Sequence, residues 1–125
     1  MADQNDVILE SFPSRQVLDL IADKWRPLVM YTLGQGTNRY SDLQRQLPGI
    51  SKKMLTQTLR RLEDDGLLKR KVHPVVPPHV DYDLTALGNA FREPIAALCE
   101  WAKKHPAEIK AVQRNRLRNS PDAKK

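Results

Sequence analysis

The chain has little of what a secreted or membrane-bound protein needs. Its single cysteine, Cys99, cannot form a disulfide within the chain and does not suggest a secreted framework. No apolar run approaches the roughly 18 residues that span a bilayer. The first twenty residues carry acids in place of the basic and apolar segments of a signal sequence. The sequence therefore predicts a cytoplasmic protein with no membrane partner.

Catalytic and metal-binding patterns are also missing. The three histidines, His73, His79 and His105, show no paired ligand spacing, and one cysteine cannot build a thiolate zinc site. There is no glycine-rich phosphate loop, and the Ser, His and Asp residues form no catalytic motif. We therefore expect no enzymatic activity, no metal and no cofactor. Cys99 lies beside an apolar seam, where a buried, inert thiol is the common case.

What the chain does have is a basic charge on an ordinary globular composition. At 125 residues, with 40% hydrophobic and 29% charged residues, it predicts one folded domain. The formal net charge is +6 and the sequence pI is about 9.7, which favours polyanionic partners. Nucleic acid is the first such partner and an anionic membrane surface the second.

The stretch from Ser41 to Leu84 predicts a winged helix-turn-helix. A short helix over residues 41–47 is followed by the turn Pro48-Gly49-Ile50-Ser51 and by a longer helix from Lys52 to about Asp65. Two strands, Leu67–Val72 and Val80–Leu84, then form a ribbon. In this fold the second helix enters the major groove and the ribbon lies along the backbone. The expected fold class is mainly α with a small β wing.

Three local details of this stretch are expected. Ser41 with Gln44 matches a capping box, and Ser51 is expected to cap the longer helix. Asn38-Arg39-Tyr40 could form a minimal strand. The buried stripe of the longer helix is expected to comprise Met54, Leu55, Thr58, Leu59 and Leu62.

Further helices are expected on both sides of this stretch. They run from Pro13 to Ala22, from an N-cap at Asp23 to the glycines at 34 and 36, from an N-cap at Thr85 past Trp101, and from Ala107 to Leu117. The first helix is expected to be apolar at Val17, Leu18, Leu20 and Ile21. Residues 1–12 are interpreted as an N-terminal arm, 13–118 as the domain and 119–125 as a flexible tail.

The helix that starts after Thr85 carries an apolar seam. Leu87, Phe91, Pro94, Leu98 and Trp101 recur at alternating spacings of four and three, which is typical of a packed helical interface. Pro94 lies inside the seam, removes one backbone donor and is expected to kink the helix.

The outward face of the helix from Lys52 is the candidate DNA-reading surface. Its side chains through Arg61 are basic or neutral hydrogen-bonding groups, whereas a merely solvated face usually mixes both signs of charge. Thr56 and Gln57 are the candidates for base edges, and Ser51 is expected to cap the helix and also to reach a phosphate. The remaining basic residues are expected to hold phosphates: Lys52, Lys53, Arg60 and Arg61.

The predicted wing adds further basic residues. Its DNA-contact candidates are Arg70, Lys71 and His79, with Lys69 and His73 beside them. Prolines stiffen the connecting loop, which suits contact with the minor groove or backbone, although a plain surface turn is nearly as good an interpretation. Along the second strand, Val80, Tyr82 and Leu84 should be buried while Asp81 and Asp83 face solvent.

Several separated motifs resemble the HxlR-type winged helix-turn-helix regulators. They lie between about Pro13 and Trp101: Ile21-Ala22-Asp23-Lys24-Trp25, Arg39-Tyr40-Ser41-Asp42-Leu43, Leu47-Pro48-Gly49-Ile50-Ser51, the run from Leu55 to Leu67, and the run from Val75 to Gly88. The resemblance implies a bacterial or archaeal transcription factor that works as a homodimer. It also implies that the first helix and the C-terminal helices form the dimer interface.

One position departs from the family pattern. Many members have a cysteine directly before the proline that opens the first helix, and some use it to sense oxidants or electrophiles. This chain has Phe12 there. Redox sensing through that site is therefore excluded, and Cys99 does not inherit the role.

We expect a homodimer that binds a pseudo-palindromic double-stranded DNA site, with repression as the default outcome. Two alternatives stay open. The fold could serve as a protein-interaction module, which would favour a mixed or apolar recognition face. It could also be a DNA-binding sensor with an unknown small-molecule effector at the dimer junction near Trp25, Tyr31, Phe91 and Trp101, although simple core packing explains these aromatics better.

Overall fold

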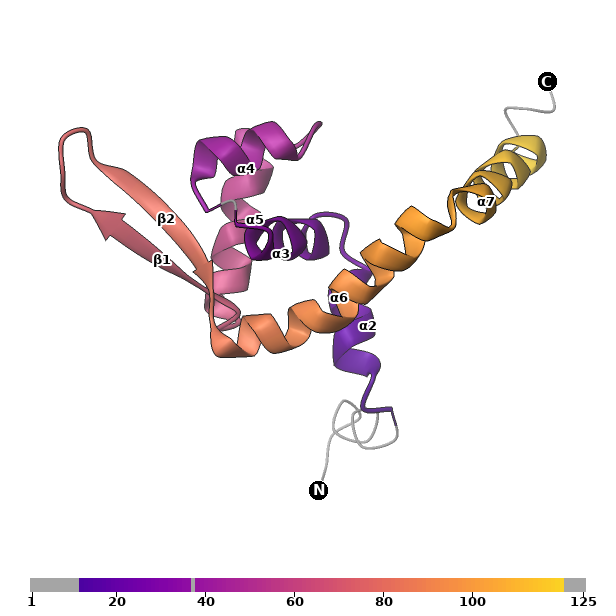
Figure 1. Ribbon diagram of the computed structural model, residues 1–125, viewed down its shortest axis with the longest axis horizontal. Helices are drawn as coiled ribbons and strands as arrows, with labels where there is room; N and C mark the ends of the chain where they lie inside the picture. Colours follow the sequence, from indigo (N-terminus) through magenta and orange to yellow (C-terminus); the bar gives the residue numbers. More distant parts are fainter. Residues whose placement is uncertain (1–11, 37, 121–125) are drawn as a thin grey trace. The chain divides into compact units, whose positions relative to one another are not determined.

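The structure, a computed structural model, describes residues 12–36 and 38–120 (Figure 1). The chain divides after Ile95 into two units. Of the predicted N-terminal arm only Phe12 lies within the described residues, and of the predicted tail only Asn119 and Ser120. Within the described ranges, no helix is both long and apolar enough to cross a membrane.

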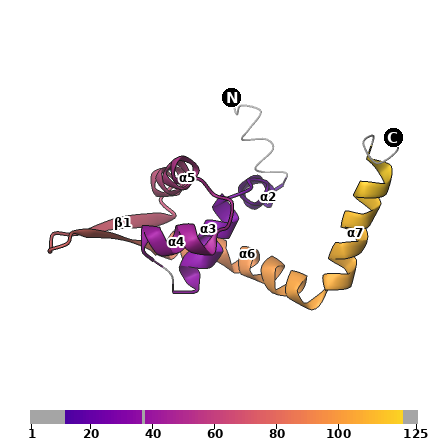
Figure 2. The same cartoon turned by 90° about the horizontal axis from the view of Figure 1, so that it is seen from above.

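The first unit has the element order of a winged helix-turn-helix. It contains the helices α2 (Arg15–Ile21), α3 (Arg26–Gly34), α4 (Tyr40–Gln46) and α5 (Lys52–Asp64), followed by the strands β1 (Leu68–His73) and β2 (His79–Leu84). Helix α6 (Ala86–Lys104) begins in this unit and ends in the second, which also contains α7 (Pro106–Asn119). Both views show β1 and β2 extending as a ribbon from the helices of the first unit (Figures 1 and 2). The predicted mainly α fold with a small β wing is confirmed.

The two strands pair antiparallel, from Leu68 opposite Leu84 to His73 opposite His79. On the other side of β2, the Tyr82 N–H donates to the carbonyl of Asn38 at 2.8 Å, and Arg39 forms a single bridge with Asp81. The minimal strand expected at Asn38-Arg39-Tyr40 is therefore reduced to a single bridge at Arg39, because Tyr40 already begins α4.

This pairing explains why the predicted capping box is wrong. Because Arg39 is held extended beside β2, it becomes the N-cap residue and α4 starts at Tyr40. Ser41 then lies within the first turn, and the helix end has no side-chain cap.

Helix α5 begins and ends as its sequence predicts. The Met54 N–H donates to Ser51 Oγ at 3.0 Å, and Gly66 follows the helix with φ +75°, a conformation that glycine adopts without strain. Leu55, Thr58, Leu59 and Leu62 are buried. Met54 is wrong as a member of the stripe, because 39% of it is exposed.

The core of the first unit is built mainly from leucines of α2 to α5, to which α6 adds Ile95. On α2 only Leu20 is buried, whereas Leu18 is exposed, so the predicted apolar face of that helix is only partly covered. The buried apolar residues are Leu20, Val29, Met30, Leu33, Leu43, Leu47, Ile50, Leu55, Leu59, Leu62, Leu67, Leu68 and Ile95.

The start of α6 is fixed tightly against the end of α5. Thr85 Oγ1 accepts from the Gly88 N–H at 3.0 Å, which confirms the predicted cap, and donates to the carbonyl of Gly66 at 2.6 Å. A Cβ on Gly88 would lie 1.8 Å from the carbonyl oxygen of Leu67. Only glycine allows this close approach of helix and strand. Pro94 stands further along the same helix, next to the boundary between the two units.

We expect Gly88→Ala to lower the free energy of unfolding by at least about 1–3 kcal/mol, because the new methyl group would collide with a backbone carbonyl that cannot rotate away. Asn89→Ala, at the next exposed position of the same helix, should stay within about 0.5 kcal/mol of the wild type. Urea unfolding of both variants gives the comparison. Equal stabilities would contradict the close approach.

Candidate nucleic-acid interface

The outer face of α5 is formed by Lys53, Gln57 and Arg60. All three are exposed, and a helix of 3.6 residues per turn places them on one side, opposite the buried leucines. No acidic residue lies on this face before Asp64, in the last turn. The surface thus offers two cations around a neutral amide, which can both donate and accept hydrogen bonds.

Tyr40 bonds to one edge of this face. Its hydroxyl donates to the backbone carbonyl of Lys52 at 2.9 Å and lies 3.0 Å from Thr56 Oγ1. Because the tyrosine proton is already used, Thr56 donates in the second bond. Thr56 is half-buried, whereas Gln57 is exposed, so the structure separates the two residues predicted to read bases. Tyr40 was not predicted as a site residue, because its neighbours in the sequence do not indicate a partner sixteen residues away.

The opposite edge carries an ion-pair network. Arg61 Nη1 lies 3.1 Å and Arg26 Nε 3.0 Å from Asp23 Oδ2, and Arg26 Nη1 lies 3.5 Å from Asp65 Oδ2. Arg61 was predicted to hold a phosphate. The structure instead pairs it with Asp23, which lies just before α3.

Asp23 is the centre of this network. Helix α3 starts at Arg26, three residues after the predicted N-cap, yet Asp23 Oδ1 accepts from the N–H groups of Trp25 at 2.9 Å and Arg26 at 3.2 Å. Burial alone would raise the pKa of Asp23, but these two amides and the Arg26 guanidinium outweigh it and lower the pKa below 3.8. One carboxylate therefore joins the start of α3 to α5.

The wing meets α5 around Tyr82. Thr56, Arg60, Glu63, Arg70 and Tyr82 are among the residues that line a recess of about 80 Å³ between the helix and the ribbon. Burial raises the pKa of Tyr82. Arg60 of α5 and Arg70 of the wing both line this recess, together with the acidic Glu63.

A second, more open recess lies between the start of α4 and the wing. It has a volume of about 480 Å³ and is lined by Arg39, Tyr40, Ser41, Pro78, His79, Val80 and Tyr82. His79, a predicted DNA contact, is thus brought beside Arg39 and Ser41. Neither of those two was predicted as a site residue. Lys71, another predicted contact, is exposed on β1 opposite Asp81.

His73, His79 and Asp81 gather at the loop end of the wing. His73 Nε2 lies 2.7 Å and His79 Nε2 4.0 Å from Asp81 Oδ2, and the two imidazole rings are stacked with centroids 4.4 Å apart. The prediction of no paired histidine ligands is therefore wrong for His73 and His79, because these two residues meet across two strands. Asp81 was expected to face solvent, yet only 17% of its side chain is exposed.

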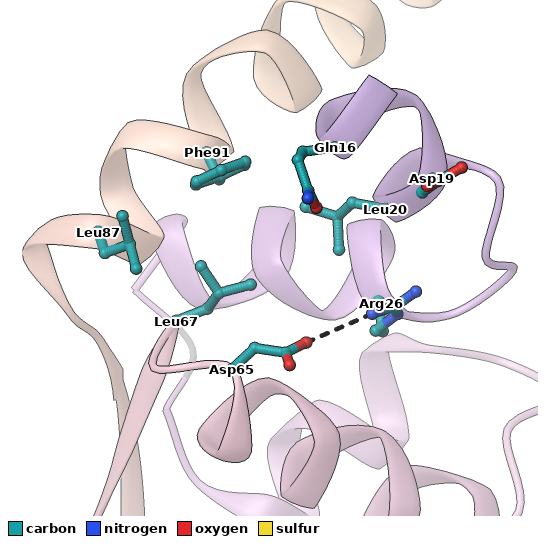
Figure 3. A pocket seen from close by; sticks show the side chains of 8 residues that line it. All are labelled: Gln16, Asp19, Leu20, Arg26, Asp65, Leu67, Leu87 and Phe91. Atoms are coloured by element: carbon teal, nitrogen blue, oxygen red, sulfur yellow. Dashed lines mark hydrogen bonds and ion pairs between the residues drawn. The ribbon is translucent and has the colours of Figure 1, made fainter. Parts of the chain in front are cut away.

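A third recess, of about 290 Å³, lies on the first unit between α2 and α6 (Figure 3). Its lining includes Leu20, Leu67, Leu87 and Phe91, with the Arg26–Asp65 pair at one side. Of the aromatics proposed to surround a small ligand, Phe91 lines this recess, while Tyr31 lies under the Arg92 guanidinium and Trp25 under Lys24.

A helix-turn-helix with a basic outer face and a basic ribbon beside it defines a winged-helix protein of the DNA-binding class. A family model described as HxlR-like helix-turn-helix matches residues 20–110. The chain belongs to this family, and it is a transcriptional regulator for which DNA binding is implied.

Individual relatives agree with this assignment. The chain is 44% identical to the uncharacterized HTH-type transcriptional regulator YtfH of Escherichia coli (strain K12), over 90% of both chains. Among solved structures it is similar to the transcriptional regulator ytfH from Salmonella typhimurium, with a TM-score of 0.69, 44% identity and coverage of 82% of this chain and 91% of that one. It is also similar to the reduced redox regulator HypR, with a TM-score of 0.72, 33% identity and coverage of 79% and 98%. These relatives are regulators and not enzymes, as predicted.

We expect Asp23→Asn to lower the free energy of unfolding at pH 7 by about 1–3 kcal/mol, because it removes charged hydrogen bonds to two arginines. The lowered pKa of Asp23 means that its contribution is complete above about pH 3.8 and is lost as the pH falls below that value. The difference between variant and wild type should therefore shrink at about pH 3. Chemical unfolding at both pH values measures it.

Asp19→Asn is the matched control, because Asp19 pairs with Arg15 on α2 while both side chains are more than half exposed. It should cost no more than about 0.5 kcal/mol at either pH. A loss equal to that of Asp23→Asn would show that the network adds nothing beyond a surface ion pair.

Proposed function

We propose that the chain is a cytoplasmic repressor that binds a pseudo-palindromic DNA operator as a homodimer through the outer face of α5. The observation that carries the proposal is that Lys53, Gln57 and Arg60 share one exposed face, which has no acidic residue before Asp64 in the last turn. Two such helices would enter successive major grooves about 34 Å apart.

The contacts around α5 sharpen the proposed roles. Gln57 is exposed, with no side-chain hydrogen bond to another described residue, and it can pair with a base through both the carbonyl and the amino group of its amide. Thr56 keeps only acceptor capacity, since its proton goes to Tyr40, so it would accept from a base amino group. Ser51 accepts from the Met54 N–H and can still donate its own proton to a phosphate.

Phosphate contact is proposed for the basic residues on the outer face and wing: Lys52, Lys53, Arg60, Arg70, Lys71 and His79. Arg61 leaves this set because of its ion pair with Asp23. Such contacts fix the position of the protein on the duplex without reading its sequence.

The proposed homodimer rests on the apolar seam of α6. Leu98 is 51% and Trp101 49% exposed, and Leu87 is similarly open, although the seam repeats like a packed helical interface. Helix α7 adds the exposed Ile109, Val112 and Leu117. Covering apolar side chains of this size with a second apolar surface removes them from water and lowers the free energy.

The two alternatives differ in their support. A protein-interaction module would call for a mixed or apolar recognition face, which α5 does not have. A small-molecule effector would bind in the recess beside Phe91, where apolar side chains lie next to the Arg26–Asp65 pair (Figure 3). We keep this second function as an addition to DNA binding, tested by screening ligands against operator release.

We expect Gln57→Ala to relax base preference while Lys53→Ala weakens binding to all sequences about equally. Lys53→Ala should also reduce the slope of log affinity against log salt by about 1, because one phosphate contact is lost. The operator would come from selecting bound fragments of the host genome. Salt-series binding to that operator and to single-base variants then measures both effects.

Lys110→Ala controls for the loss of one positive charge, because Lys110 is exposed on α7. It should leave the salt slope and the base preference unchanged. Identical specificity profiles for Gln57→Ala and Lys53→Ala would contradict the division of roles, and a flat salt response of the wild type would contradict the phosphate contacts.

We expect Leu98→Glu to raise the dimer dissociation constant at least about tenfold, because a charge would enter the apolar seam. Ala97→Glu, at the neighbouring exposed position off the seam, should leave it nearly unchanged. Sedimentation equilibrium measures both. A wild-type chain that is monomeric at micromolar concentration would overturn the homodimer.

A further inference from the structure

The loop end of the wing brings three metal-ligand side chains to one face. His73 and His79 are the last pair of the ribbon, and Asp81 follows His79 by two residues on the same strand. Cross-strand partners share a face of the sheet, as do alternate residues of one strand, so all three side chains point the same way. Their nearest ligand atoms all lie within 4.8 Å of one another.

The carboxylate at the centre is only partly satisfied. His73 bonds to Asp81 Oδ2 at 2.7 Å, while Asp81 Oδ1 is buried and has no hydrogen-bond partner among the described residues. The nearest cation to Oδ1 is Arg39 Nε at 3.8 Å, beyond hydrogen-bond distance. A buried carboxylate oxygen without a donor is costly, and a cation bound at the other oxygen, Oδ2, would offset the negative charge of the whole carboxylate.

We propose that His73, His79 and Asp81 form a binding site for Zn²⁺ at the loop end of the wing. Two imidazole nitrogens and one carboxylate oxygen are a common Zn²⁺ donor set, and a water molecule completes the tetrahedron. A single imidazole would be enough to hydrogen-bond Asp81, whereas a metal ion would use both histidines as ligands. The proposal stands on the wing alone and does not depend on DNA binding.

The distances fit a small adjustment. Zn²⁺ lies about 2.0–2.1 Å from nitrogen and oxygen ligands, so tetrahedral ligand atoms are separated by roughly 3.3 Å. The two separations from Asp81 Oδ2 are 2.7 Å and 4.0 Å, one shorter and one longer than this value. Side-chain rotation on a fixed hairpin can bring both to it. The stacked rings would have to turn apart, because each nitrogen lone pair must point at the metal.

Two neighbouring cations oppose the metal. Lys71 stands directly opposite Asp81 in the strand register, and Arg39 approaches Asp81 from the other side. Both side chains stabilise the negative charge of Asp81, but both repel the positive charge of Zn²⁺. Removal of Lys71 should therefore strengthen Zn²⁺ binding, an outcome that misfolding would not imitate.

The test is calorimetric titration of the untagged, chelator-treated full chain with Zn²⁺. We expect one Zn²⁺ per chain, and a loss of affinity of at least about tenfold in His79→Ala and in Asp81→Asn, since even outer-shell changes cost about 10- to 100-fold. Lys71→Met, which keeps the apolar stem of the side chain, should bind several-fold more tightly. His105→Ala is the matched control, because His105 stacks on Trp101 outside the cluster, and it should bind as the wild type does.

Imidazole nitrogen NMR spectra provide the second measurement. Zn²⁺ should shift the ring resonances of His73 and His79 and leave those of His105 in place. The proposal is overturned if the wild type shows no saturable binding, if His79→Ala and Asp81→Asn bind Zn²⁺ like the wild type, or if His105→Ala loses it. Weaker binding by Lys71→Met would equally contradict the site.

Discussion

The burial of one side of α5 is the constraint on which the recognition surface depends. Leu55, Leu59 and Leu62 are almost completely enclosed, and they fix the rotation of the helix about its own axis. With 3.6 residues per turn, that rotation leaves no choice about which side chains point outward. Lys53, Gln57 and Arg60 lie together because the three leucines do. A helix rotated by one position would bury charge, which costs far more than the burial of a leucine gains.

Polar contacts at the two edges of α5 also hold side chains near its outer face in place. Tyr40 bonds to Lys52 and Thr56 on one edge, and Asp23 pairs with Arg61 on the other. Each buried leucine contributes about 1.5–3 kcal/mol, whereas a net hydrogen bond contributes about 1 kcal/mol. Apolar burial therefore decides the orientation, and the edge contacts reduce the remaining freedom of side chains near the face. As a result, Arg61 and Thr56 each have part of their hydrogen-bonding capacity already used within the protein.

The features of α5 that depend on neighbouring residues could be predicted from the sequence. The apolar period of α5, the Ser51 cap and the glycine after the helix are all properties of neighbouring residues, and apart from Met54 the structure has them as expected. The failed cap at Ser41 has a different cause, since a strand forty residues later holds Arg39 extended and moves the helix start.

The same limit explains the parts of the site that were missed. Tyr40 with Thr56, Asp23 with Arg61 and His73 with His79 are contacts between separated segments. Their partners are fixed by packing and strand register, which no short window of sequence contains. The alternation along β2 correctly predicted that Asp83 is exposed. It was wrong for Val80, Tyr82 and Leu84, which are half-buried and not buried, and for Asp81, which is half-buried beside the bridge from Arg39.

Asp81 places a negative charge on the wing, and the neighbouring residues neutralise that charge only in part. A carboxylate on a ribbon expected to follow phosphates would repel them, and its repulsion grows as the site is desolvated. Arg39 offsets the charge from one side at 3.8 Å, and His73 bonds the other oxygen at 2.7 Å. A Zn²⁺ ion on His73, His79 and Asp81 would go further and make the local charge positive. The loop end of the wing would then attract the DNA phosphates, which the carboxylate without the metal repels. Binding of Zn²⁺ and binding of DNA would therefore each favour the other.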